Sequence, residues 1–272
     1  MAGARHPAAP LDPHALRVMS FNIRVNVSDD GPNAWPHRRD MVASMIRFHQ
    51  ADVIGVQEAY REMTDDLQRR LAGYRWVGVG SSDGRDAGVA NPIFWRESRL
   101  DLLHWETRWL TPTPEVAGSI GWDARFPRTA TIAVLRDRHS NLTLHVFNVH
   151  FDHVGTQARI ESGRMLAAMA NDLPTTACAA AMGDFNCGPE EQPITEILKS
   201  QLRNARESSL NGAHGPSGSF TGFDSLVPKT PMIDHMFVSP SVTVQQYGVL
   251  ADHFDGRLPS DHFPVLAELI LS

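Results

Sequence analysis

The sequence has 272 residues, of which 42% are hydrophobic and 21% charged, and its formal net charge is −6. This composition is that of an ordinary globular protein, and the length fits a single domain. The acidic balance argues against tight non-specific binding to DNA, because that binding depends on lysines and arginines that neutralise phosphates. A small phosphorylated substrate is compatible with the same charge.

The N-terminus and the cysteines bear on where the protein resides. Residues 1–15 are rich in Ala, Pro and Arg but contain no apolar core segment, so we expect a disordered lead-in rather than a signal peptide. The sequence contains no run of about eighteen apolar residues, so we expect no membrane-spanning helix. Cys178 and Cys187 form neither a CxxC motif nor a Cys/His cluster, and we expect free thiols. A cytoplasmic protein whose residues 16–272 form a single domain is the simplest interpretation.

Strands and helices alternate along the chain. Short apolar runs predict strands over residues 16–23, 52–56, 74–79, 92–96, 100–110, 129–136, 142–149, 178–182, 233–238, 242–250 and 263–271. Amphipathic spacing predicts helices from near Trp35 onward and over residues 62–71, 156–172 and 194–200. Pro36 suits the first turn of the first helix, and Thr156 is the expected N-cap of the third. Loops are expected over residues 111–128 and 211–218.

Polar side chains stand at the boundaries of several predicted strands. These clusters are Phe21-Asn22, Gln57-Glu58, Asn148-Val149-His150, Gly183-Asp184-Phe185-Asn186, Ile233-Asp234-His235 and, ahead of the last strand, Pro259-Ser260-Asp261-His262. Acids and amides are poor strand formers. Open sheets place ligands at the ends of their strands, so we expect these clusters to converge on one site.

Hydrolysis of a phosphate ester requires such groups. A hard cation, held by carboxylate and amide oxygens, neutralises the phosphoryl charge. Asp184 could deprotonate a water, with Asn186 orienting the nucleophile or the phosphate. Asp234 could hold His262 in the cationic form that donates to a non-bridging oxygen. Taken singly, each residue also fits a turn, a cap or a core position, so the argument rests on the ordered set.

In this order the clusters resemble the motifs of the endonuclease/exonuclease/phosphatase superfamily. The group includes pancreatic-type deoxyribonucleases, abasic-site endonucleases and inositol-phosphate phosphatases, and the resemblance spans residues 18–266. It implies an α/β fold, a four-layered sandwich of two packed mixed β-sheets flanked by helices. It also implies Mg²⁺ or Mn²⁺ bound mainly by Glu58, with Asn22 and Asp261 close to the metal.

The same resemblance implies roles for the remaining cluster residues. Asp184 would activate water, and Asn186 would bind the phosphate. Asp234 would pair with His262, and His150 would contact the scissile phosphate.

Residues in the predicted loops are candidates for substrate binding. Arg128 matches a phosphate-contacting arginine of some superfamily members. The segments Gly31–Trp35, Gly121-Trp122-Asp123 and Ser219–Phe223 resemble a bacterial branch of the superfamily. Asn33, Trp35, Trp122 and Phe223 are therefore candidates, although exposed loop aromatics serve packing as often as ligand binding.

Two positions depart from that bacterial branch. Relatives usually carry a glutamate after the glycine that corresponds to Gly88, whereas this chain has Val89. That glutamate would sit beside His150, and a valine can neither orient nor charge an imidazole. Asp152 is a candidate substitute. In addition, His235 stands where many relatives have tyrosine.

Three functions remain open. The acidic charge favours a phosphatase or phosphodiesterase that acts on a small phosphorylated substrate, with no stable nucleic-acid complex and no membrane partner. A nuclease would need a basic groove, and the pairs Arg38-Arg39 and Arg69-Arg70 are predicted to lie on solvated helix faces. A drifted member with a binding role or other metal-assisted chemistry is the third possibility, motivated by Val89. The retained acids and histidines argue against it.

Overall fold

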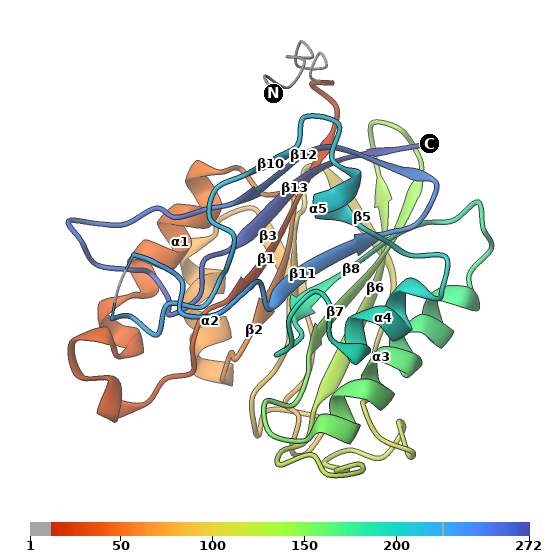
Figure 1. The fold of residues 1–272 in the computed structure, drawn as a ribbon. Coiled ribbons are helices and arrows are strands. Elements are labelled where there is room, and N and C mark those ends of the chain that lie inside the picture. Colours follow the sequence, from red (N-terminus) through yellow and green to blue (C-terminus); the bar gives the residue numbers. More distant parts are fainter. Residues whose placement is uncertain (1–11, 225) are drawn as a thin grey trace, which may run out of the picture.

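Two β-sheets pack face to face and form the centre of the protein (Figure 1). The computed structural model describes residues 12–224 and 226–272, so most of the expected lead-in lies outside the described residues. The seven-stranded sheet has the order β10 (Ala213–His214), β12 (Val242–Val249), β13 (Val265–Leu271), β1 (Leu16–Asn22), β2 (Val53–Gln57), β4 (Ile93–Arg96) and β3 (Tyr74–Val77). The six-stranded sheet has the order β5 (Leu100–Trp109), β6 (Thr129–Asp137), β7 (Thr143–His150), β8 (Cys178–Asp184), β11 (Asp234–Val238) and β9 (Arg203–Asn204).

Helices cover the outer face of each sheet. On the seven-stranded sheet lie α1 (Arg39–Phe48) and α2 (Arg61–Arg70), whose buried residues share a core cluster with Phe21 and Ile54. On the six-stranded sheet lie α3 (Thr156–Asn171) and α4 (Gln192–Leu198), which share a second cluster with Phe147 and Phe237. A third cluster fills the space between the sheets. Four layers result, and the predicted fold class is confirmed. Short elements complete the chain: η1 (Ser28–Asn33), η2 (Trp35–His37) and α5 (Ala205–Ser208).

Alternation along the strands directs the polar strand ends inward. In β1, Val18 belongs to the core between the sheets, whereas Met19 and Phe21 belong to the outer cluster. Side chains two residues apart share a face, so Asn22 points into the space between the sheets. The same alternation applies in the other three strands. His150 shares a face of β7 with Val146, Asp184 shares a face of β8 with Met182, and Asp234 shares a face of β11 with Met236. Val146, Met182 and Met236 all belong to the core between the sheets.

Several local predictions need correction. The first long helix begins at Arg39, because Trp35–His37, with Pro36, forms a separate 3₁₀ turn. Thr156 is the first residue of α3 and not its N-cap. The cap comes from the 111–128 loop, because the carboxylate of Asp123 accepts from the backbone N–H groups of Gln157 (3.2 Å) and Ala158 (2.7 Å).

Arg38 does not lie on a solvated face as predicted. Its side chain is fully buried and its guanidinium donates to the carbonyl oxygens of Ile23 (2.7 Å) and Pro259 (2.8 Å). The arginine therefore ties the loop after β1 to the loop before β13, both of which carry site residues. Residues 12–224 and 226–272 contain no helix long and apolar enough to cross a bilayer.

Candidate active site

An inter-sheet amide pair forms the floor of the candidate site. The Gln57 side chain donates to Oδ1 of Asn148 at 2.6 Å, and the Asn148 amide donates to the carbonyl oxygens of Val56 (2.8 Å) and Pro92 (3.0 Å). Gly55 makes room for this contact, because a Cβ there would lie 2.8 Å from the Asn148 side chain. The two sheets are thus joined directly beneath the polar strand ends.

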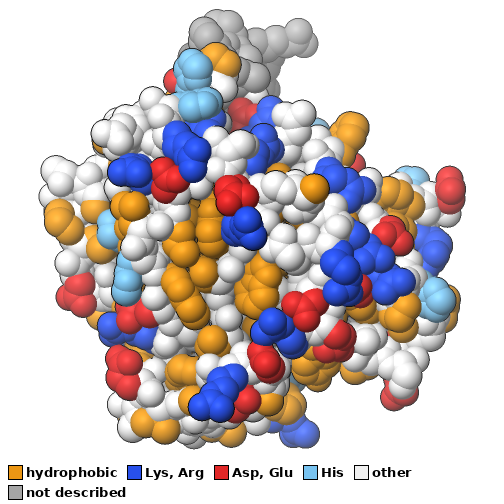
Figure 2. All heavy atoms as spheres, turned by 180° about the vertical axis from the view of Figure 1, so that it is seen from behind, with side chains coloured by type: hydrophobic (Ala, Val, Ile, Leu, Met, Phe, Trp, Pro, Cys, Tyr) orange, Lys and Arg blue, Asp and Glu red, His pale blue; other side chains and the backbone are white. Residues whose placement is uncertain are grey.

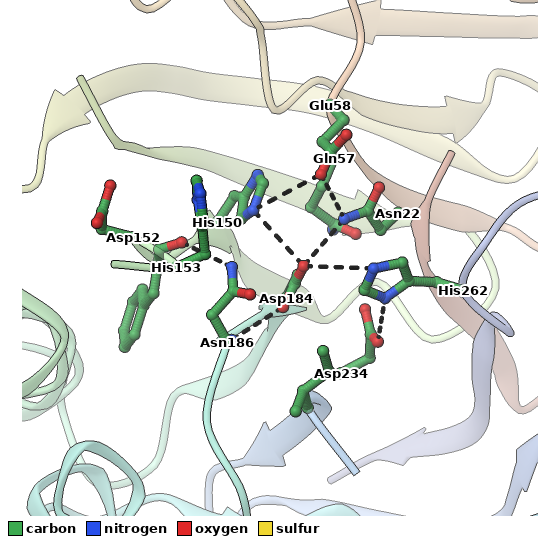
Figure 3. A network of polar contacts seen from close by, with 12 residues as sticks. Asn22, Gln57, Glu58, His150, Asp152, His153, Asp184, Asn186, Asp234 and His262 are labelled. Atoms are coloured by element: carbon green, nitrogen blue, oxygen red, sulfur yellow. Dashed lines mark hydrogen bonds and ion pairs between the residues drawn. The ribbon is translucent and has the colours of Figure 1, made fainter. Parts of the chain in front are cut away.

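Above this floor, strand ends from both sheets bring an amide and two carboxylates together (Figure 3). The Nδ2 group of Asn22 donates to Oδ2 of Asp184 at 2.9 Å and to Oε1 of Glu58 at 3.1 Å. Glu58 follows β2 in a left-handed backbone conformation (φ 64°), and its other oxygen accepts from the backbone N–H of Val25 at 2.9 Å. The backbone turn therefore aims Glu58 back toward Asp184.

These groups fit a divalent cation. Ligand atoms of Glu58, His150 and Asp184 lie within 4.8 Å of one another. The two carboxylates in this group are the donors that Mg²⁺ and Mn²⁺ prefer. Asp261 borders the same pocket as Glu58, 3.9 Å from Nε of Arg24, although it is not part of this ligand group.

A carboxylate–histidine pair lies on one side of Asp184. Nδ1 of His262 is 2.7 Å from Oδ2 of Asp234, and Nε2 of His262 is 3.8 Å from Oδ2 of Asp184. Burial disfavours the imidazolium, but the charges of Asp234 and Asp184 outweigh it and raise the pKa of His262 well above its usual value. The backbone N–H of Asp234 donates to Oγ of Ser219 (3.2 Å), which links the Ser219–Phe223 segment to this pair.

Asp184 itself has the protonation behaviour of a general base. Burial, with the added charge of Asp234, raises the pKa of Asp184 to about 7, against the opposing influence of His262 and of the Asn186 backbone N–H. A base works best when its pKa lies near the working pH. Asn186 lines the pocket next to Asp184, and its side chain is anchored by a 3.0 Å bond to the carbonyl oxygen of Phe151.

His150, on the other side of Asp184, contacts an arginine. Its Nε2 lies 3.5 Å from Oδ2 of Asp184, and its Nδ1 lies 2.9 Å from a terminal nitrogen of Arg128. Burial, together with the charge of Arg128, lowers the pKa of His150 well below its usual value. In the described part of the chain, no hydrogen bond or ion pair joins Asp152 to His150. Asp152 instead faces Nε of Arg128 at 3.4 Å.

Two adjoining pockets open onto these groups, and they share Arg24, Glu58 and His153. The first has a volume of about 380 Å³, and its other lining residues include Tyr60, Ser81, Ser82, Val89, Phe126, Arg128 and His150. The second has a volume of about 500 Å³, and its other lining residues include Asp184, Asn186, Phe220, Thr230, Asp261 and His262. The reacting groups therefore lie between two compact pockets.

Of the loop candidates for substrate binding, Arg128 lines the first pocket, whereas Asn33, Trp35, Trp122 and Phe223 lie outside both pockets. Trp35 is 1% exposed, packs against α1 and α2, and donates from Nε1 to Asp66 at 3.0 Å. Asn33 supplies its carbonyl oxygen to Arg38. Phe223 packs against the inner core beneath the Arg38 guanidinium, and Trp122 is exposed to solvent.

The sequence reasoning missed other lining residues. Arg24 and His153 follow the polar ends of β1 and β7 within three residues, and this proximity was a usable signal. Phe126, 46% exposed and stacked on His153 at 5.9 Å, carried no comparable signal. His235 lies on the outer face of β11, where its Nε2 contacts the carbonyl oxygen of Cys187 at 3.0 Å.

Comparison with known proteins identifies relatives over nearly the whole chain. Residues 19–262 match the model of the Endonuclease/Exonuclease/phosphatase family. The structure of a mannosyl-6-phosphatase from Bacteroides thetaiotaomicron is 33% identical with a TM-score of 0.89, covering 94% of this chain and 100% of that one. An uncharacterised protein of Acanthamoeba polyphaga mimivirus is 28% identical over 85% of this chain and 91% of its own. The D. rerio TDP2 structure with a single-strand DNA product has a TM-score of 0.73 and covers 94% and 98%, but at 19% identity it supports the fold alone.

Proposed function

We propose, from the premise that this chain belongs to the endonuclease/exonuclease/phosphatase family of phosphate-ester hydrolases, that it hydrolyses a small phosphorylated substrate by in-line attack of an activated water. The observation that carries this proposal is the convergence of Asp184, Glu58 and the Asp234–His262 pair on one point between the sheets. A cation-binding carboxylate, a base and a cationic donor are the groups that phosphoryl transfer requires.

Different residues of the chain would bind the metal, accept the proton and stabilise the charge on the phosphate. Glu58, with Asn22 and Asp261 nearby, would hold Mg²⁺ or Mn²⁺, which when bound neutralises phosphoryl charge. Asp184 takes the proton of the attacking water, because its pKa of about 7 leaves it partly ionised at neutral pH. The His262 imidazolium, held by Asp234, donates to a non-bridging oxygen, and Asn186 orients the phosphate or the nucleophile.

The dimensions of the site favour a small substrate. Pockets of about 380 and 500 Å³ fall within the range of small-molecule sites. On the face seen in Figure 2, Asp and Glu side chains lie next to most of the Lys and Arg side chains. With the net charge of −6, these features support the absence of a stable nucleic-acid complex or membrane partner. The buried free cysteines are consistent with a cytoplasmic location.

A phosphorylated sugar is the first substrate to test. The relative from B. thetaiotaomicron, named as a mannosyl-6-phosphatase, supports this choice. So does the first pocket, which combines the hydroxyl groups of Ser81 and Ser82 with the aromatic rings of Tyr60 and Phe126. Hydroxyl groups can bond a polyhydroxylated ring, and aromatic faces can pack against its C–H groups.

The test is a panel of hexose phosphates, inositol phosphates, nucleotides and phosphodiesters, assayed with Mg²⁺ or Mn²⁺ and again with EDTA. We expect metal-dependent release of phosphate from a small monoester and a loss of about 10²–10⁴-fold in kcat for Asp184→Asn. Asp65→Asn on the exposed face of α2 is the matched control. Turnover that survives EDTA, or an Asp184→Asn enzyme as active as the control, contradicts the mechanism.

Two other results of the substrate panel would favour the alternative functions. Cleavage of DNA or RNA at physiological salt, in preference to every small substrate, would favour the nuclease alternative. Metal binding without hydrolysis of any substrate in the panel would favour a drifted member with a binding role or other metal-assisted chemistry.

A further inference from the structure

No carboxylate contacts Nδ1 of His150 in the described part of the chain, although the resemblance to the bacterial branch implies a glutamate beside this ring. Val89 lines the same pocket as His150 and offers no polar group. Asp152, the candidate substitute for that carboxylate, makes its hydrogen bonds to other groups. One of its oxygens accepts from the backbone N–H groups of Val154 (2.9 Å) and Gly155 (2.7 Å), and the other faces Nε of Arg128.

Arg128 takes the place of that partner. It is 7% exposed, and each of its nitrogens has a protein partner. One terminal nitrogen lies 2.9 Å from Nδ1 of His150, the other lies 2.9 Å from Nδ1 of His153, and Nε lies 3.4 Å from Asp152. Asp152 thus anchors the guanidinium, and the guanidinium in turn contacts two imidazole rings.

The chemistry of the guanidinium determines the direction of these bonds. An arginine side chain has five N–H donors, no acceptor, and does not lose its proton in proteins. Nδ1 of His150 must therefore be an acceptor without a proton, which places the ring proton on Nε2. That atom points to the reacting groups, 3.5 Å from Oδ2 of Asp184. A carboxylate partner would give the reverse arrangement, with the proton on Nδ1.

We propose that Arg128 is a positioning residue that holds His150 through Nδ1 and so presents the Nε2–H of a neutral imidazole to the phosphate ester. This inference rests on the proposed function. In the resulting site, His150 stabilises developing charge as a hydrogen-bond donor and transfers no proton. The inference differs from direct phosphate binding by Arg128, because the arginine acts through the histidine.

The wild-type protein provides the first test. Nitrogen-15 NMR of histidine-labelled protein distinguishes protonated from unprotonated ring nitrogens, and comparison with His150→Gln assigns the signals of His150. We expect an unprotonated Nδ1 and a protonated Nε2 at neutral pH. A protonated Nδ1 overturns the inference, since such an atom cannot accept from Arg128. This measurement needs no turnover, so its failure is distinguishable from failure of the proposed function.

A double-mutant cycle provides the second test. With the best substrate of the panel, Arg128→Gln should lower kcat by about 10–100-fold, the cost typical of losing a residue that orients an active group. In a His150→Gln background the same change should cost less than about threefold, because the group it positions is already absent. Equal losses in both backgrounds would mean that Arg128 contacts the phosphate itself and would overturn the inference.

Controls separate positioning from folding. Arg125→Gln, which changes an exposed arginine of the same loop, should leave kcat unchanged. Arg128→Lys keeps the charge but lacks the fork that reaches both rings, so it should recover less than about a tenth of the lost kcat. Full recovery by lysine overturns the inference. If Arg128→Gln fails to fold, the NMR result on the wild-type protein decides.

Discussion

Two histidines flank Asp184 and have partners of opposite charge. Nε2 of His262 lies 3.8 Å and Nε2 of His150 lies 3.5 Å from the same carboxylate oxygen. Nδ1 of His262 faces the carboxylate of Asp234 at 2.7 Å, whereas Nδ1 of His150 faces the guanidinium of Arg128 at 2.9 Å. The partner behind each ring therefore decides whether the ring that faces the substrate is cationic or neutral.

The comparison shows how one residue type can supply two functions in one site. A cationic imidazole stabilises negative charge that has already formed, and a neutral imidazole donates a hydrogen bond without carrying charge. We call His262 with Asp234 the His262 arm, and His150 with Arg128 the His150 arm. The two arms also differ in the elements that carry them. Asp234 is the first residue of β11, whereas Arg128 ends a long loop, just before β6.

The largest expected effect is on the His262 arm. Asp234→Asn removes the charge that keeps His262 protonated, so we expect kcat at pH 7 with Mg²⁺ to fall by about 10²–10⁴-fold. A stopped or continuous assay of phosphate release measures this loss of kcat, with Asp65→Asn as the control. If Asp234→Asn lowers kcat less than Arg128→Gln does, the partner of His150 matters more than the partner of His262, which contradicts this prediction.

Metal titration tests which arm lies nearer the cation. Two ligand groups can be drawn among the described residues, one with Glu58 and His150 and the other with Asp234 and His262, and both include Asp184. We expect Glu58→Gln to weaken Mg²⁺ binding in calorimetry by at least about 100-fold, because losing a residue that only supports a metal ligand already costs up to about 100-fold. We expect Asp234→Asn to change it little. The reverse result would move the cation to the His262 arm.

The pH profile tests the carboxylate between the arms. The raised pKa of Asp184, about 7, means that the base gains its charge as the pH rises. At limiting metal, kcat/KM should therefore increase between about pH 6 and pH 8. A bound cation favours the ionised carboxylate, so the acid limb should move to lower pH as Mg²⁺ is increased. An acid limb that is absent or insensitive to Mg²⁺ contradicts this assignment.

The smallest effect is expected at the rim of the His150 arm. Phe126→Ala removes an exposed ring from the first pocket but touches none of the reacting groups. We expect KM for a sugar phosphate to rise by about 2- to 10-fold, the value of one aromatic contact, with kcat nearly unchanged. Steady-state kinetics with a hexose phosphate and with inorganic phosphate as inhibitor measure the difference. A change confined to kcat would mean that Phe126 supports His153 and Arg128 rather than the substrate.

Local pattern was enough to predict eleven of the strands and the polar residues at their ends, but it missed the two-residue strands β9 and β10, the second of which lies in the predicted 211–218 loop. Alternation with a period of two is a property of neighbouring residues, so it can be read along β1, β7, β8 and β11 without knowing how they pair. It puts Asn22 on the same face as Val18 and Asp184 on the same face as Met182, and the packing of the two sheets shows that these faces are the inner ones. The family resemblance then supplied the four-layered fold and the expected roles, because the order of the motifs is itself contained in the chain.

Only the tertiary structure decided which side chains meet across loops. Arg128 is 22 positions from His150, and nothing in the spacing distinguishes it from Asp152 as the partner of that ring. Arg38 was expected on a solvated helix face, and Trp35 was a candidate for substrate binding or for packing. Both are buried, because elements distant in sequence cover them. The chemical composition of the site was thus determined along the sequence. The charge behind each histidine depended on long-range packing, which no local pattern encodes.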